Sequence, residues 1–101
     1  MFKRIPSIST AELADKLPEK PLLIDVREPH EFRGGHIPRA KNIPLGQVVN
    51  FKSTEPVYVI CASGMRSKRA VKMMRKNGMD ATNVKGGMML WQGVTKGGAK
   101  S

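Results

Sequence analysis

Apolar residues along the chain follow two spacings, one typical of helices and one typical of buried strands. Ser9-Thr10-Ala11-Glu12 has the form of a capping box, and Leu13 and Leu17 then recur at helical spacing until Pro18. The next run, 21–26, is apolar and β-branched, and it is too short for a free-standing helix. These patterns predict a short first helix followed by a buried strand.

The middle of the chain predicts smaller elements. Residues 28–33 suit one helical turn, with Pro29 at its start and acidic side chains near its positive end. A short strand is expected at 40–43. After Pro44 we expect a small helix, with one side lined by Leu45, Val48 and Val49.

The clearest strand of the second half is 57–61, which ends on the only cysteine. Residues 67–77 then predict a helix, whose inward residues are Ala70, Val71, Met73 and Met74. A last strand is expected at 82–84, followed by a short helix that Gly86-Gly87 opens. A cluster of four methionines is expected to fill the core: Met73, Met74, Met79 and Met88.

Strands that alternate with helices predict an α/β domain with a mainly parallel central sheet and helices on both faces. Such sheets place their sites at the carboxyl ends of the strands. Asp25 and Cys61 both occupy such ends, so we expect the site there.

The chain of 101 residues is long enough for one domain only. We expect a lead-in at 1–7, the domain at 8–94 and a flexible basic tail at 95–101. One cysteine excludes an intrachain disulfide and a multi-cysteine metal site. Neither a signal peptide nor a run of about 20 apolar residues is evident, so we expect a soluble cytoplasmic protein, without a membrane partner and monomeric.

Positive charge is concentrated in the second half. Residues 1–50 carry 8 Lys and Arg against 6 Asp and Glu, whereas residues 51–101 carry 10 against 2. The chain has few aromatic residues to stack bases and no nucleic-acid motif, so we expect no nucleic-acid partner. The basic surface either is simply solvated or attracts small anions and acidic proteins.

The segment from Cys61 to Ser67 carries the candidate chemistry. A short loop of small residues, with Gly64 free to adopt positive φ, leads from a strand into a helix. Its backbone N–H groups and the helix N-terminus favour a thiolate or a small oxyanion, and the guanidinium of Arg66 is suited to oxyanions. The alternative is an inert buried cysteine at a strand end.

An ordered set of short segments resembles a single-domain rhodanese, a thiosulfate-type sulfurtransferase, from about Ile8 to Val94. The matching segments are Leu23-Ile24-Asp25-Val26-Arg27-Glu28, Glu31-Phe32, Gly35-His36-Ile37-Pro38, Ala40-Lys41-Asn42-Ile43-Pro44, Tyr58-Val59-Ile60-Cys61, Gly64, Arg66-Ser67, and Gly86-Gly87 with Trp91.

This resemblance implies a rhodanese-like fold and a ping-pong sulfur transfer. Cys61 is implied as the catalytic sulfur carrier, which takes sulfane sulfur from thiosulfate or a related small anionic donor as a persulfide. A thiol, a protein thiol or cyanide then accepts it. Substrate binding is implied for the loop Ala62, Ser63, Gly64, Met65 and Arg66, with Arg66 on the donor anion. Neither a cofactor nor a metal is expected.

Other matched residues are interpreted as structural. We expect Asp25 and Arg27 to pair with each other or with loop backbone, His36 to be a hydrogen-bonded scaffold residue, and Trp91 to anchor the core. Arg39 departs from the family pattern, because many relatives have Gly there, and it leaves the local turn undefined.

Two alternatives stay open. A Cys-dependent phosphatase or arsenate reductase on the same scaffold usually has one more residue between Cys and Arg. Here four residues separate Cys61 from Arg66, position 67 is Ser, and Ile60 stands where such phosphatases usually keep His. A non-catalytic protein-binding module is the other alternative, although such modules commonly lose the cysteine that this chain retains.

Overall fold

The structure, a computed structural model, describes residues 4–100. Its centre is a sheet of five strands in the order β1-β5-β4-β2-β3, and every pairing is parallel. The prediction of a mainly parallel sheet is therefore confirmed. The strands are β1 Ser7–Ile8, β2 Leu22–Asp25, β3 Lys41–Asn42, β4 Val57–Ile60 and β5 Ala81–Val84.

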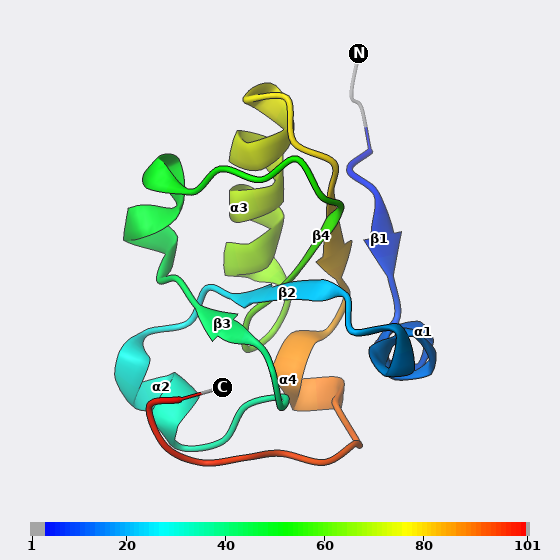
Figure 1. Cartoon of the computed structure of the whole chain (residues 1–101), viewed down its shortest axis with the longest axis vertical. Coiled ribbons are helices and arrows are strands. Elements are labelled where there is room, and N and C mark those ends of the chain that lie inside the picture. The colour runs from blue at the N-terminus through cyan, green and yellow to red at the C-terminus, as the bar shows by residue number, and fades with distance from the viewer. Residues whose placement is uncertain (1–3, 101) are drawn as a thin grey trace.

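Helices cover both faces of this sheet, as expected (Figure 1). One face is covered by α3 and the 3-10 helix η2, and the other by α1, α2 and α4. The helices are α1 Thr10–Lys16, the 3-10 helix η1 Leu17–Glu19, α2 Pro29–Arg33, the 3-10 helix η2 Leu45–Asn50, α3 Met65–Lys76 and α4 Gly87–Leu90.

The first helix begins at the predicted capping box. The Ser9 hydroxyl accepts a hydrogen bond from the Glu12 backbone N–H at 3.0 Å, and the Glu12 carboxylate accepts one from the Ser9 N–H at 3.0 Å. Two N–H groups that have no partner within the helix are thereby satisfied. The capping box fixes the point at which the chain leaves β1.

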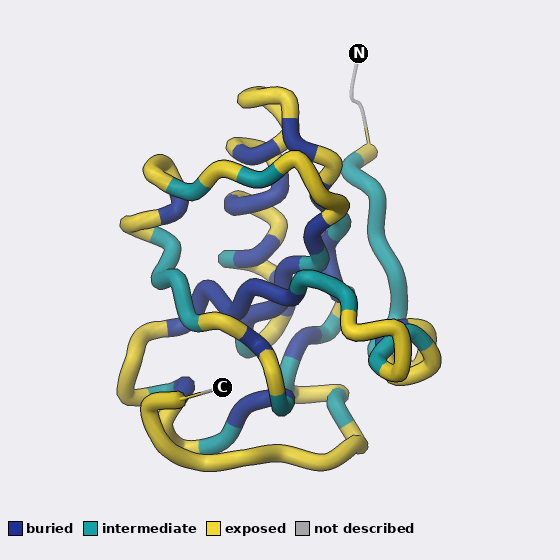
Figure 2. The backbone as a smooth tube through the Cα atoms, viewed as in Figure 1, coloured by how far each residue is buried: buried dark blue, intermediate teal, exposed yellow. Residues whose placement is uncertain are grey.

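Two apolar clusters, one on each side of the sheet, form the core. Figure 2 shows buried residues along the central strands and at intervals along α3. Ile24, Val59 and Val71 belong to the cluster under α3, and Leu13, Phe32 and Ile60 to the cluster under α1 and α2. Because successive strand residues point to opposite faces, Val59 and Ile60 serve different clusters. Burial on both faces explains why the strands are apolar runs rather than alternating patterns.

Three details of the predicted helices are wrong. Helix α3 begins at Met65, so Met65 and Arg66 belong to its first turn rather than to a loop. Its buried residues, Ser67, Ala70, Val71 and Met74, follow the spacing i, i+3, i+4, i+7, which leaves Met73 outside the inner stripe. Val49 likewise points outward from η2 and is 55% exposed.

The methionines do not form one cluster. Met74 and Met79 are buried under α3, whereas Met88 packs against the cluster on the opposite face and Met73 is exposed. The sheet separates the two groups, and the sequence alone did not indicate on which side Met88 would lie.

The chain ends also differ in detail from the expected picture. Ile8, which we placed at the start of the domain, belongs to the two-residue strand β1, which pairs with β5. From Lys96 to Lys100 the backbone contacts the region of α2: Lys96 and His36 exchange N–H···O bonds of 2.8 and 2.9 Å, and the Gly98 N–H donates to Arg33. Residues 1–3 of the lead-in and residue 101 of the tail lie outside the described residues.

Within residues 4–100, no helix is both long and apolar enough to cross a membrane.

Candidate active site

Cys61 directly follows β4, which lies between β5 and β2 in the sheet. Its side chain is fully buried. The Sγ atom accepts a hydrogen bond from the Gly64 N–H at 3.1 Å, so the chain curls back over the sulfur. Gly64 has φ of 100°, the left-handed conformation that the sequence predicted for this position.

A polar chain of two further side chains continues from the sulfur. The Ser67 hydroxyl lies 3.3 Å from Cys61 Sγ and donates to Asn83 Oδ1 at 2.5 Å. Ser67 is in the first turns of α3, and Asn83 is in β5, opposite Val59 of β4. All three side chains are buried, so each hydrogen bond lies in a region of low dielectric.

These contacts change the acidity of the thiol. Burial raises the pKa of the Cys61 thiol. Hydrogen bonds from the Ser67 side chain and from the backbone of Ser67, Gly64 and Ser63 lower this pKa by more than burial raises it. The net pKa therefore lies below the ordinary value for a thiol. A lowered pKa enriches the thiolate, which is the nucleophilic form.

The hydroxyl of Ser67 has one proton, which limits what it can donate. While it donates to Asn83 Oδ1, it can only accept from the Cys61 thiol. When the thiol ionises, the hydroxyl can donate to the thiolate if the Asn83 amide rotates and presents Nδ2 to Ser67 instead. The side chain of Asn83, which is both donor and acceptor, fits either state.

The loop is held from behind by α4. The N–H groups of Met88 and Met89 donate to the carbonyls of Cys61 and Ala62 at 2.8 and 2.9 Å. Gly87 makes this approach possible, because a Cβ atom there would collide with the Cys61 and Ala62 carbonyls. The Gly86-Gly87 pair therefore shapes the site from the far end of the sequence.

Arg66 forms a bidentate ion pair. Its Nη1 and Nη2 atoms donate to the two carboxylate oxygens of Glu31 in α2, at 2.6 and 2.9 Å. The hydrogen bonds from Arg66 lower the pKa of Glu31 to about 2, and Glu31 in turn raises the pKa of Arg66. The charge of an ionised Cys61 also raises the pKa of Arg66.

Asp25 and Arg27 pair with each other, as expected. Arg27 Nη2 lies 2.8 Å from Asp25 Oδ2 and also donates to the Gly35 carbonyl at 2.8 Å. His36 is buried, stacks on Phe32, and has its ring nitrogens 2.8 and 3.1 Å from the carbonyls of Phe32 and Lys100. These contacts support the interpretation of all three residues as scaffold.

The structure brings the sequence-predicted loop together around one sulfur, but its members differ in exposure. Gly64 is buried, Ala62 is half-buried, Ser63 is exposed, and the Met65 side chain is 72% exposed. Sequence reasoning missed Glu31 and Asn83 as parts of the site, and it gave no role to Ser67 at the end of the predicted segment. A buried polar residue inside the short strand 81–84 was the one available signal for Asn83.

No group of three or more His, Cys, Asp or Glu side chains within residues 4–100 is arranged to hold a metal ion.

The fold and this loop together define an α/β protein with a cysteine site at the carboxyl end of a parallel sheet. Residues 9–93 match the family described as Rhodanese-like domain, and the chain belongs to that family.

Relatives and solved structures agree with this assignment. The chain is 44% identical over 98 residues to the putative sulfurtransferase YtwF of Bacillus subtilis, covering 91% of this chain and 95% of that protein. It is 49% identical over 82 residues to the uncharacterized protein YqhL of the same organism, covering 76% of this chain but only 65% of YqhL. A crystal structure of a rhodanese-like domain protein from Staphylococcus aureus is similar, with a TM-score of 0.85 and 38% identity, over 93% of this chain and 99% of that one.

Proposed function

We propose that this protein is a sulfurtransferase that moves sulfane sulfur from thiosulfate or a related anionic donor to a thiol or cyanide, through a persulfide on Cys61. Family membership and relatives named sulfurtransferase support the general activity, including a thiosulfate sulfurtransferase, GlpE, of Pseudoalteromonas translucida at 29% identity. The observation that carries the proposal is the Cys61 sulfur, which the Gly64 N–H and the Ser67 hydroxyl contact and whose pKa is lowered.

The first half-reaction is a displacement at sulfur. The Cys61 thiolate attacks the outer sulfur of thiosulfate and forms a new S–S bond. The bond between that sulfur and the sulfite sulfur breaks, and sulfite leaves with the electron pair. Cys61 then holds an anionic persulfide, whose terminal sulfur needs the same N–H donors that favour the thiolate.

The second half-reaction reverses the roles. A cyanide ion or a thiolate acceptor attacks the terminal sulfur, and the bond between the two sulfurs breaks. The electron pair returns to Cys61 Sγ, which regenerates the thiolate. No external oxidant or reductant is consumed.

Arg66 is the proposed ligand of the donor anion. The Arg66 side chain is 34% exposed and extends from the first turn of α3. Its guanidinium already binds one anionic group, the Glu31 carboxylate. A bound dianion would share or replace that contact, because a guanidinium offers five donors.

The test is the intact mass of the protein after incubation with thiosulfate. We expect the gain of one sulfur atom in the native chain, its loss on addition of cyanide, and no gain in Cys61→Ser, which should retain its melting temperature. Thiosulfate turnover by folded Cys61→Ser at the native rate would contradict the assignment. Hydrolysis of p-nitrophenyl phosphate without any persulfide would favour the phosphatase alternative instead.

A further inference from the structure

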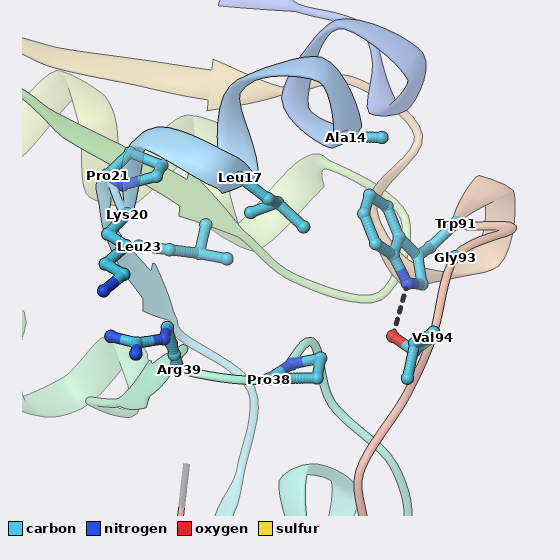
Figure 3. Close-up of a pocket in the computed structure, with 10 residues that line it drawn as sticks. All are labelled: Ala14, Leu17, Lys20, Pro21, Leu23, Pro38, Arg39, Trp91, Gly93 and Val94. Atoms are coloured by element: carbon cyan, nitrogen blue, oxygen red, sulfur yellow. Dashed lines mark hydrogen bonds between the residues drawn. The ribbon is translucent and has the colours of Figure 1, made fainter.

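A cavity of about 280 Å³ lies apart from the cysteine loop (Figure 3). None of its lining residues belongs to the segment 61–67. It is walled by η1 and the end of α1, the start of β2, the turn at Pro38-Arg39 and the segment after α4. Six of the lining residues matter below: Ala14, Leu17, Lys20, Leu23, Arg39 and Trp91.

Most of the wall is apolar and is held in place by the fold. Leu23 is buried in the sheet, and Leu17 and Trp91 pack against the same apolar cluster. The Trp91 indole N–H donates to the Val94 carbonyl at 3.1 Å, which fixes the ring along one side of the cavity. An apolar group that entered would find three large hydrophobic side chains already arranged around it.

The cationic side chains of Lys20 and Arg39 lie together at the end of the cavity opposite Trp91 (Figure 3). Both side chains belong to exposed residues, and neither has an ion-pair partner within residues 4–100. The cavity therefore has a polar, positively charged end and an apolar body.

The backbone at these two positions is unusual. Lys20 has φ of 55° and Arg39 has φ of 75°, and within residues 4–100 no other residue except glycine has positive φ. Glycine or asparagine adopts this conformation at lower cost than a long side chain. The chain thus carries long cationic side chains at both left-handed positions beside the cavity, where smaller residues fit the backbone better.

From this arrangement we infer that the cavity binds a small amphipathic carboxylate, with its hydrocarbon part between Leu17, Leu23 and Trp91 and its carboxylate at Lys20 and Arg39. The volume lies near the lower limit of about 300 Å³ for small-molecule sites, which suits a medium-chain or single-ring acid and excludes a nucleotide-sized ligand. This inference is independent of the chemistry at Cys61.

Trp91 makes the inference directly measurable, because it is the only tryptophan of the chain. The fluorescence of Trp91 would be titrated with octanoate and with two probes of equal chain length, octan-1-ol and octylammonium. We expect a saturable change with octanoate, an affinity for octan-1-ol about 5- to 30-fold weaker, and no binding of octylammonium. The chain carries a formal charge of +10, so the general attraction of anions must be separated from this site.

A pair of double variants makes that separation. The first double variant, Lys20→Asn with Arg39→Asn, removes both cations and places at each position a residue that tolerates positive φ. The second, Lys72→Gln with Lys76→Gln, removes the same amount of charge from α3. We expect the first to bind octanoate no better than octan-1-ol, and the second to retain the native preference. Ala14→Phe, which adds bulk at the cavity wall, should weaken both probes, with folding of each variant checked by its melting temperature.

Three results would overturn the inference. One is the absence of any saturable response of Trp91 to octanoate. Another is equal affinity for octanoate and octan-1-ol in the native chain, which would make the cavity a plain apolar groove open to a protein side chain. The third is an equal loss of octanoate binding in the two double variants, which would assign the effect to net charge.

Discussion

The guanidinium of Arg66 holds both carboxylate oxygens of Glu31, at 2.6 and 2.9 Å. This pair joins α2, which follows β2, to α3, which follows Cys61. The cation proposed to bind the donor is therefore oriented before any donor arrives, and an incoming dianion meets a carboxylate already in place.

Replacement of Arg66 by Ala should reduce the kcat/KM for thiosulfate by about 10- to 150-fold, since charge-assisted hydrogen bonds contribute roughly 1.5 to 3 kcal/mol. Steady-state kinetics with thiosulfate and cyanide measure this. Arg69→Ala removes one exposed cation of the same helix and serves as the control. Unchanged efficiency in Arg66→Ala, with unchanged stability, would remove Arg66 from the site.

The Glu31–Arg66 pair should stabilise the fold only above a certain pH. The pKa of Glu31 falls from 4.5 to about 2 on folding. The stabilisation is therefore present in full above about pH 4.5 and is lost as the pH falls towards 2. Glu31→Gln should lower the free energy of unfolding by up to about 1 kcal/mol at pH 7.

Urea denaturation of the native chain and of Glu31→Gln, at pH 7 and at the lowest pH where both remain folded, measures the difference. Glu19→Gln, on the exposed 3-10 helix η1, is the matched control. A gap between native chain and Glu31→Gln that stays constant with pH would contradict the ion-pair explanation.

Ser67→Ala should raise the pKa of the Cys61 thiol, because the thiolate loses the side-chain hydrogen bond that favours it most. The rate of alkylation by iodoacetamide, measured against pH, should then rise at higher pH than in the native chain. Asn83→Asp should act in the same direction, since a carboxylate only accepts and keeps the Ser67 proton away from the sulfur.

Ser63→Ala is the control for these two variants, because the Ser63 side chain makes no hydrogen bond to the sulfur. An alkylation profile of Ser67→Ala that coincides with the native one would show that backbone donors alone set the thiol acidity.

Gly87→Ala should destabilise the protein by about 2 to 4 kcal/mol, because Gly87 has φ of 57° and its new methyl group would meet the Cys61 and Ala62 carbonyls. Gly46→Ala, where a methyl group meets nothing within 4 Å, should change stability by less than about 1 kcal/mol. Chemical denaturation compares the two. Similar stabilities for both variants would mean that α4 readily moves away from the loop.

The exposed basic face of α3 should steer acidic protein acceptors to a Cys61 persulfide. The face comprises Lys68, Arg69, Lys72, Arg75 and Lys76. Replacement of its three lysines by Gln should slow transfer to an acidic thiol protein at low salt, while transfer to cyanide changes less. High salt should remove the difference, because exposed charges are screened over about 8 Å at physiological ionic strength.

The control is a triple variant that removes the same charge from other surfaces, with Gln in place of Lys41, Lys52 and Lys85. If both triple variants transfer sulfur to the protein acceptor at the native rate at low salt, the face is solvated surface and nothing more.

The fold was predictable because its determinants are local. The capping box at Ser9, the apolar runs of β2 and β4, and the Gly64 turn after Cys61 each act within a few residues, and each appears where it was expected. The parallel sheet then follows from the alternation of strands and helices, whereas the order of its strands was not predicted.

The rest of the site depended on contacts across long stretches of sequence. Glu31 meets Arg66, Ser67 meets Asn83, and Met88 meets the Cys61 carbonyl only because the sheet brings α2, α3, β5 and α4 to one edge. Strand β1 was missed for the same reason, since a two-residue strand has no periodicity and exists only through β5. The placement of Lys20 and Arg39 beside one cavity likewise depends on contacts between distant parts of the sequence.

The pairing of β1 with β5 and the hydrogen bonds from α4 to the Cys61 loop have a consequence for synthesis on the ribosome. The first strand has no partner until residues 81–84 have left the exit tunnel, and the carbonyls behind the sulfur stay open to water until residues 87–90 follow. The residues that lower the pKa of the Cys61 thiol, Ser63, Gly64 and Ser67, emerge before α4. During synthesis the loop around the sulfur can therefore form first, and the hydrogen bonds that hold it from behind are added last.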